Sequence, residues 1–99
     1  MANPSFLAHK TGDYVAVAVR DVGRGEEVLV GYLDGTDSET VEVTAEIPLG
    51  HKVALRDVPS GDDVIEYGVR TAIASADISR GDYAHTHNLR SARWQNSVA

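Results

Sequence analysis

Hydrophobic and polar residues alternate with a period of two along much of the chain. In YVAVAV (14–19) three valines share one face, while Tyr14 and two alanines share the other, so both faces are apolar or small. This pattern predicts a strand that is covered on both sides. The alternation returns in VLVGY (28–32) and TVEVTA (40–45). The Asp-Gly pair in the polar stretch between these two segments predicts that they form a hairpin.

Four more short strands are predicted in the second half of the chain. They are KVAL (52–55), VIEY (64–67), TAIASA (71–76) and YAHTH (83–87). No segment places apolar residues at helical spacing over three turns. The pattern therefore predicts an all-β fold with at most single helical turns.

A nine-residue pattern occurs three times: RDVGRGEEV from Arg20, RDVPSGDDV from Arg56 and ADISRGDYA from Ala76. Each copy has an Asp, a β-branched residue, two variable residues, a Gly and an acid. The Asp can accept backbone N–H bonds just ahead of it, the β-branched residue can enter the core, and the Gly can adopt positive φ. We predict three corners of one design in a pseudo-symmetric β-fold, with an architectural role.

The size and charge of the chain limit its function. Its 99 residues predict a single domain over 1–99, with a core of about 9–90 and a tail or linker at 91–99. A net charge of −6 disfavours binding to nucleic acid and to anionic membranes. The absence of cysteine excludes disulfides and cysteine-based metal sites. No long apolar run or signal peptide is apparent, so we expect a cytoplasmic location.

Candidate chemistry gathers in GDYAHTHNLRS (81–91), which holds two of the four histidines. On a regular strand His85 and His87 would point to one face, where they could hold one metal ion or contact a substrate. Two histidines are too few ligands for a complete metal site, so other ligands would come from a partner. The alternative is that the pair only decorates a strand surface. Asn88 adds a neutral donor and acceptor.

A second candidate group follows Gly50. His51 and Lys52 stand at the start of a predicted strand, where side chains often reach a cleft. The alternative is that these residues only begin an exposed strand and have no functional role. Lys52 could pair with a substrate carboxylate or act as a base.

Further positive charge follows near the C-terminus. Arg90 and Arg93 could extend a cationic rim or bind a partner. Trp94 could anchor a partner or cover the core.

Several ordered segments resemble a known family. They are YVAVAV (14–19), GHK (50–52), ALRD (54–57), YG (67–68), ADI (76–78) and HTHN (85–88). In this order they resemble the SAF domain of the altronate/galactarate dehydratase group, which is also the small subunit of the related sulfolactate sulfo-lyase. The resemblance runs from about His9 to Arg90. Glu66, Ala72, Ala84 and Tyr14 depart from residues frequent in the family, which bears on the substrate more than on the fold.

The resemblance implies a β-clip fold, in which short strands are wrapped by a long hairpin. It also implies that the chain is the small subunit of a lyase that removes water from a sugar acid, such as altronate or galactarate, to give a 2-keto-3-deoxy acid. A separate large catalytic subunit would hold most of a divalent metal site, for Fe²⁺ or Mn²⁺. The chain alone would be inactive. Self-association into a homo-oligomer stays open.

With the resemblance added, each candidate residue has an expected role. His85, His87 and Lys52 are expected to be catalytic, and the two histidines are also expected to be metal ligands. His51, Asn88 and Arg90 are expected to bind substrate. Two alternatives remain: the small subunit of a sulfolactate sulfo-lyase, from which bisulfite leaves, and a carbohydrate-binding module without catalysis.

Overall fold

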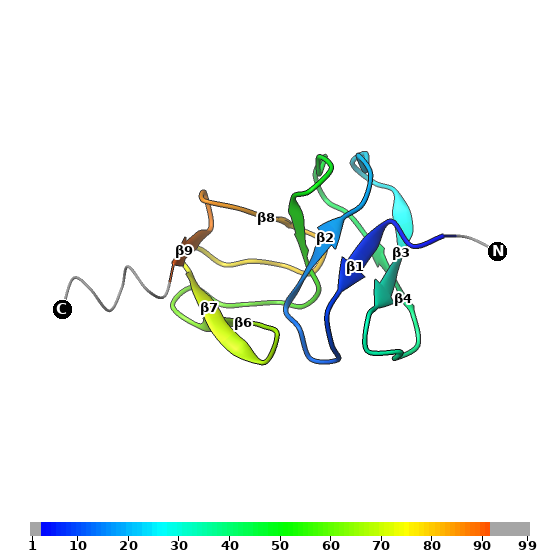
Figure 1. Cartoon of the computed structure of the whole chain (residues 1–99). Coiled ribbons are helices and arrows are strands. Elements are labelled where there is room, and N and C mark those ends of the chain that lie inside the picture. The colour runs from blue at the N-terminus through cyan, green and yellow to red at the C-terminus, as the bar shows by residue number, and fades with distance from the viewer. Residues whose placement is uncertain (1–2, 92–99) are drawn as a thin grey trace.

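Short strands joined by tight turns form two sheets in the computed structural model, which describes residues 3–91 (Figure 1). The strands are β1 (Phe6–Ala8), β2 (Val15–Ala18), β3 (Glu27–Tyr32), β4 (Glu39–Glu42), β5 (Lys52–Ala54), β6 (Asp63–Glu66), β7 (Val69–Ala74), β8 (Tyr83–Ala84) and β9 (Leu89–Ser91). Residues 3–91 contain no helix, so none there could cross a membrane. The all-β prediction is confirmed, and the arrangement is consistent with a β-clip.

The larger sheet has the strand order β4-β3-β1-β2-β5-β8. Its first strand in sequence, β1, lies in its interior, parallel to β3 and antiparallel to β2. The predicted pairing of 28–32 with 40–45 is confirmed, because Val28 faces Val41 across β3 and β4. The predicted coverage of β2 on both faces is also confirmed, since Val15 and Ala16 are both buried.

The smaller sheet is the hairpin β6–β7 with β9 along its far edge. The hairpin turns through two residues, Tyr67 and Gly68, whose φ angles are +63° and +74°. Two positive φ values are typical of the type I′ turn, which suits the right-handed twist of paired strands. A tyrosine in this conformation is strained. Stacking of its ring on His9, with centroids 3.7 Å apart, opposes that strain.

A buried carboxylate holds the hairpin tip against the loop between β1 and β2. Asp13 accepts the N–H of Tyr67 at 2.9 Å through one oxygen, and those of His9 and Lys10 at 3.0 and 3.3 Å through the other. Its side chain is 4% exposed. Three charge-assisted bonds to backbone donors offset the cost of burying this group.

The repeated corners number four in the structure, because residues 45–53 (AEIPLGHKV) form another copy. In every copy a glycine with φ between +85° and +93° donates its N–H to a backbone carbonyl 2.8 Å away; these are Gly25, Gly50, Gly61 and Gly81. The predicted core residues Val22, Val58 and Ile78 are at most 3% exposed.

The corners associate in pairs, through a bridge from Val22 to Ile47 and another from Val58 to Ile78. Here one prediction was wrong in detail: each Asp caps a neighbouring corner and not its own. Asp57 accepts the N–H of Arg80, and Asp77 accepts the N–H of Ser60, both at 2.9 Å. These two corners are therefore joined by reciprocal hydrogen bonds.

The predicted strand 83–87 is shorter than expected. It ends at Ala84, and residues 85–88 form a turn that leads into β9. The argument that His85 and His87 share one face of a strand is therefore wrong.

Candidate functional site

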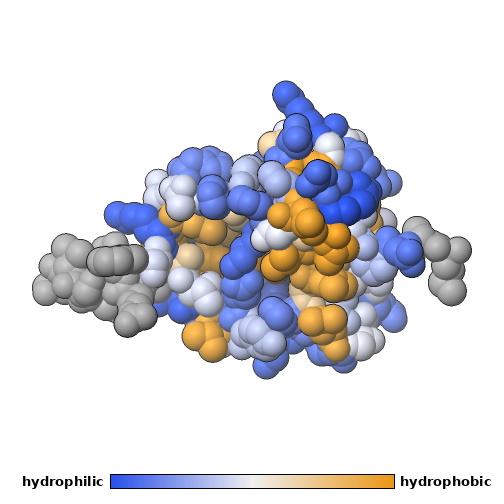
Figure 2. Space-filling model, turned by 45° about the horizontal axis from the view of Figure 1, so that its top comes forward, coloured by the Kyte–Doolittle hydropathy of each residue, from blue (hydrophilic) through white to orange (hydrophobic). Residues whose placement is uncertain are grey.

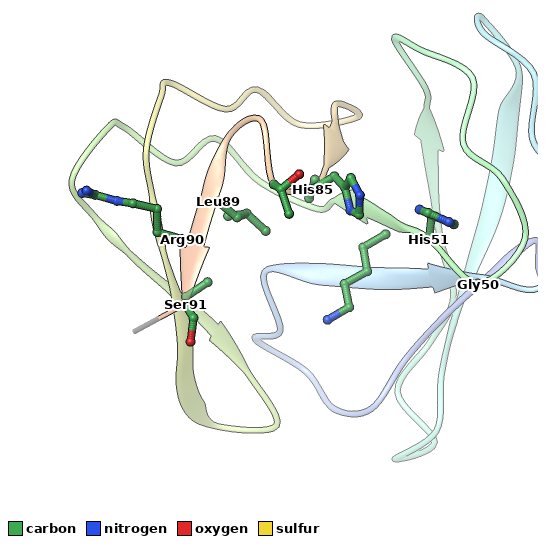
Figure 3. A pocket seen from close by; sticks show the side chains of 10 residues that line it. Gly50, His51, His85, Leu89, Arg90 and Ser91 are labelled. Atoms are coloured by element: carbon green, nitrogen blue, oxygen red, sulfur yellow. The ribbon is translucent and has the colours of Figure 1, made fainter. Parts of the chain in front are cut away.

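An open groove of about 390 Å³ lies between the two sheets (Figure 3). Gly50 and His51 form one side, at the start of β5, and Arg90 and Ser91 form the opposite side on β9. The remaining lining residues are Lys52, Ala72, Ala84, His85, Thr86 and Leu89. Small alanines at two of these positions leave room for a ligand between the sheets.

The groove is cationic in a protein that is acidic overall. Four of its lining side chains carry or can accept a positive charge: His51, Lys52, His85 and Arg90. No lining residue is an acid, although the chain has 15 Asp and Glu against 9 Lys and Arg. Such local segregation of charge favours an anionic ligand.

Tyr83 is the centre of a cluster of rings beside the groove. Its ring centroid lies 5.4 Å from that of His85, nearly parallel, and 5.6 and 5.7 Å from those of His51 and His87. The centroids of His51 and His85 are 5.2 Å apart. Three of the four histidines therefore meet here, as sequence reasoning expected, but around a tyrosine that it did not single out.

The phenol of Tyr83 also hydrogen-bonds to an imidazole. Its hydroxyl oxygen lies 2.5 Å from Nδ1 of His51. The bond leaves Nε2 as the ring nitrogen of His51 that is not engaged by Tyr83.

Asn88 supports the turn that carries the exposed His85 and His87. Its side chain is 5% exposed; its Oδ1 accepts the N–H of His85 at 2.9 Å and its Nδ2 donates to the carbonyl of Tyr83 at 2.8 Å. Both ends of the carboxamide are thus engaged inside the turn. The geometry gives Asn88 a positioning role in the turn, and its expected contact with substrate stays a prediction.

Lys52 belongs to an ion pair that joins the two sheets. Its Nζ lies 3.0 Å from Oε1 of Glu66 on β6. The ammonium group has three donors, so it keeps donors for a second anion. The geometry thus allows Lys52 to contact a second anion, and its expected catalytic role stays a prediction.

Arg90 lies on the side of the groove opposite His51. The guanidinium group of Arg90 points away from His51 and His85 (Figure 3). Arg93 and Trp94 lie outside the described residues.

The described residues do not form a complete metal site. Within residues 3–91 there is no group of three or more His, Asp or Glu side chains arranged to hold a metal ion. Only imidazoles gather near the groove, and two or three such ligands without a carboxylate fall short of the sites that hold Fe²⁺ or Mn²⁺. This part of the chain therefore does not fit a resident metal by itself.

Comparison of the four corners distinguishes the one that borders the groove. Directly after its glycine, each of the other three corners carries an acid: Glu26, Asp62 or Asp82. The groove corner carries His51 and then Lys52. Sequence reasoning missed this copy because Glu46 replaces the Asp and the acid after the glycine is absent; a search by the β-branched residue and the glycine alone would have found it.

Apolar side chains are exposed beside this corner. Val19 is 44% and Leu49 61% exposed, and backbone bonds between Ala18 and residues Gly50 and His51 bring their segments together. On the face seen in Figure 2, apolar side chains gather in separate areas divided by hydrophilic residues.

The amino-acid sequence of this chain matches a known protein family and several of its members. The family model for the altronate/galactarate dehydratase SAF domain matches residues 4–92. Altronate dehydratase of Escherichia coli (strain K12) is 42% identical over 78 residues, which is 79% of this chain and 14% of that enzyme. Altronate dehydratase of Bacillus subtilis (strain 168) is 36% identical over 86 residues, covering 87% of this chain and 16% of the enzyme.

A shorter relative matches over nearly its full length. The (2R)-sulfolactate sulfo-lyase subunit alpha of Chromohalobacter salexigens is 33% identical over 90 residues, which is 90% of this chain and 96% of that subunit. The chain thus spans a small part of the altronate dehydratases and almost all of this sulfo-lyase subunit.

Proposed function

Because the chain belongs to the altronate/galactarate dehydratase SAF domain family, we propose that it is the small subunit of a hydroxy-acid lyase. Its groove would bind the carboxylate of a sugar acid such as altronate or galactarate, and a separate large subunit would complete the active site. The observation that supports this most is the cationic groove without an acid in its lining.

The proposed reaction removes water from a hydroxy acid. A base takes the proton from the carbon next to the carboxylate, and the hydroxyl on the following carbon leaves with a proton from an acid. The resulting enol becomes a 2-keto-3-deoxy acid. The first step adds negative charge beside a carboxylate, so cationic or N–H donors must stabilise it.

The groove residues have separate roles in this proposal. Lys52 binds the substrate carboxylate with the donors that Glu66 leaves free. His85 and His87, which are exposed on a turn beside the groove, move protons at its edge, and His51 donates a hydrogen bond from its side of the groove. Any metal would be held mainly by the large subunit, since the described residues lack a set of ligands for it.

The large subunit is part of the proposal for two reasons. The chain covers 14% of one altronate dehydratase, so most of that enzyme has no counterpart in this chain. The groove is also open, and the exposed side chains of Val19 and Leu49 lie beside its His51 corner. A second chain seated there would bury the apolar surface and close the groove.

Reconstitution tests the proposal. The chain alone should give no keto-acid from altronate or galactarate, whereas the chain mixed with the large subunit that co-purifies with it should. A His85→Ala/His87→Ala variant should lower turnover about 100-fold or more, the effect typical of losing acid–base groups. Full activity of that variant in the complex would refute the catalytic assignment.

Lys52 is tested by a matched pair of variants. Lys52→Met should raise the KM for the sugar acid in the complex by about tenfold, because one charge-assisted contact is lost. Lys10→Met, which removes the same side chain away from the groove, should leave KM unchanged. Equal effects of the two variants would exclude a specific role for Lys52.

The sulfo-lyase alternative rests on the near-complete overlap with a sulfo-lyase subunit alpha. The same reconstituted complex should then release sulfite from (2R)-sulfolactate and leave the hexonates untouched. A carbohydrate-binding module would instead bind sugar acids saturably without any partner.

A further inference from the structure

We propose that Tyr83 is a positioning residue that fixes the tautomer of His51, so that His51 presents an Nε2–H donor to the groove. The inference about the tautomer rests on the geometry of the two rings. Its meaning for catalysis rests on the proposed function.

The contact is close and joins two corners of the fold. The Tyr83 hydroxyl oxygen and Nδ1 of His51 are 2.5 Å apart. Tyr83 stands on β8 in the 76–84 corner, and His51 directly follows Gly50 in the 45–53 corner. Their backbones are fixed by strand pairing, since Val53 on β5 faces Tyr83 across the sheet.

The chemistry of the two groups sets the direction of the bond. A phenol O–H is a better proton donor than the N–H of a neutral imidazole, and an imidazole nitrogen is a better acceptor than a phenol oxygen. The strongest arrangement at 2.5 Å has Tyr83 donating to Nδ1. The single proton of neutral His51 then resides on Nε2.

The surroundings keep the phenol in place for this bond. The ring of Tyr83 packs near those of His85, nearly parallel with centroids 5.4 Å apart, and His87, at 5.7 Å in an edge arrangement. The ring of His51 in turn lines the groove. His51 therefore enters the groove as a donor with a fixed proton, suited to an acceptor oxygen such as a carboxylate or a departing hydroxyl.

Nitrogen NMR on the chain labelled with ¹⁵N-histidine tests the tautomer directly. At pH 8 the wild-type Nδ1 of His51 should show the shift of an unprotonated nitrogen that accepts a hydrogen bond, and Nε2 that of an N–H. In Tyr83→Phe, which keeps the ring and removes the hydroxyl, the Nδ1 shift should move as its hydrogen bond is lost and the Nδ1–H form becomes populated.

The control is Tyr32→Phe, which removes another partly buried phenol hydroxyl, one that donates to Glu39. It should leave both nitrogen shifts of His51 unchanged. A wild-type His51 with its proton on Nδ1 would overturn the proposal, even if Tyr83→Phe failed to fold. Unchanged shifts in a folded Tyr83→Phe would also overturn it. Neither NMR measurement needs lyase activity. The experiment can therefore contradict the inferred tautomer of His51 without contradicting the proposed function, and the reverse also holds.

Discussion

Glycines at the corners occupy positions where a side chain would strain the backbone or clash, and Gly81 is the clearest case. Its φ is +93°, and a Cβ built there would overlap the carbonyl oxygen of Glu42. At Gly61, where φ is +92°, a Cβ would meet no atom within 4 Å. Gly61→Ala should thus cost about 1 kcal/mol from backbone strain alone, whereas Gly81→Ala should cost at least about 3 kcal/mol.

Urea unfolding followed by circular dichroism measures both glycine variants. Equal losses of stability would show that the close approach of β4 to Gly81 is absent.

A second residue-scale prediction concerns Tyr32. Burial, its hydrogen bond to Glu39 and the charge of that carboxylate raise the pKa of Tyr32 to about 12. Because the folded pKa exceeds the unfolded value of 10, this phenol adds stability below pH 10 that is lost as the pH rises towards 12. Glu39→Gln should lower the pKa of Tyr32, as followed by tyrosine ¹³C NMR. A pKa still at about 12 in that variant would rule out the carboxylate as a cause.

At the scale of elements, the hairpin β6–β7 depends on the loop between β1 and β2. Asp13→Ala would leave three backbone N–H groups without their acceptor, so it should lower the free energy of unfolding by about 3 kcal/mol or more. Asp37→Ala, at an exposed position, should change it by less than about 0.5 kcal/mol. Thermal and urea unfolding compare the two, and equal effects would contradict the role of Asp13.

Comparing the predicted strands with the observed ones shows which parts of the fold the sequence pattern can predict. Alternation predicted β2, β3 and β4 and the pairing of β3 with β4, because Val28, Val30 and Val41 are buried at alternate positions of that hairpin. It extended β8 too far, since Asn88 folds residues 85–88 into a turn by bonds that no periodicity reveals. The histidines were expected to gather, but Tyr83 was missed, because its contact with His51 depends on which strands are neighbours.

On the scale of the whole molecule, the two sheets are joined across the groove by the ion pair of Lys52 and Glu66. The side chains are 40% and 13% exposed, so solvent screens the pair in part. A double-mutant cycle with Lys52→Ala and Glu66→Ala should give a coupling energy of about 1 kcal/mol. A coupling near zero would mean that this ion pair does not help to hold the two sheets together.

The interior position of β1 has a consequence for how the chain assembles. β1 pairs with β2 along one edge and with β3 along the other, and both of these strands follow it in the sequence. Tyr32 is the last residue of β3. Until it has left the ribosome, one edge of β1 is unpaired in the nascent chain, and an unpaired edge can pair with another chain. We therefore expect this protein to depend on a chaperone most in the interval between the synthesis of β1 and that of β3.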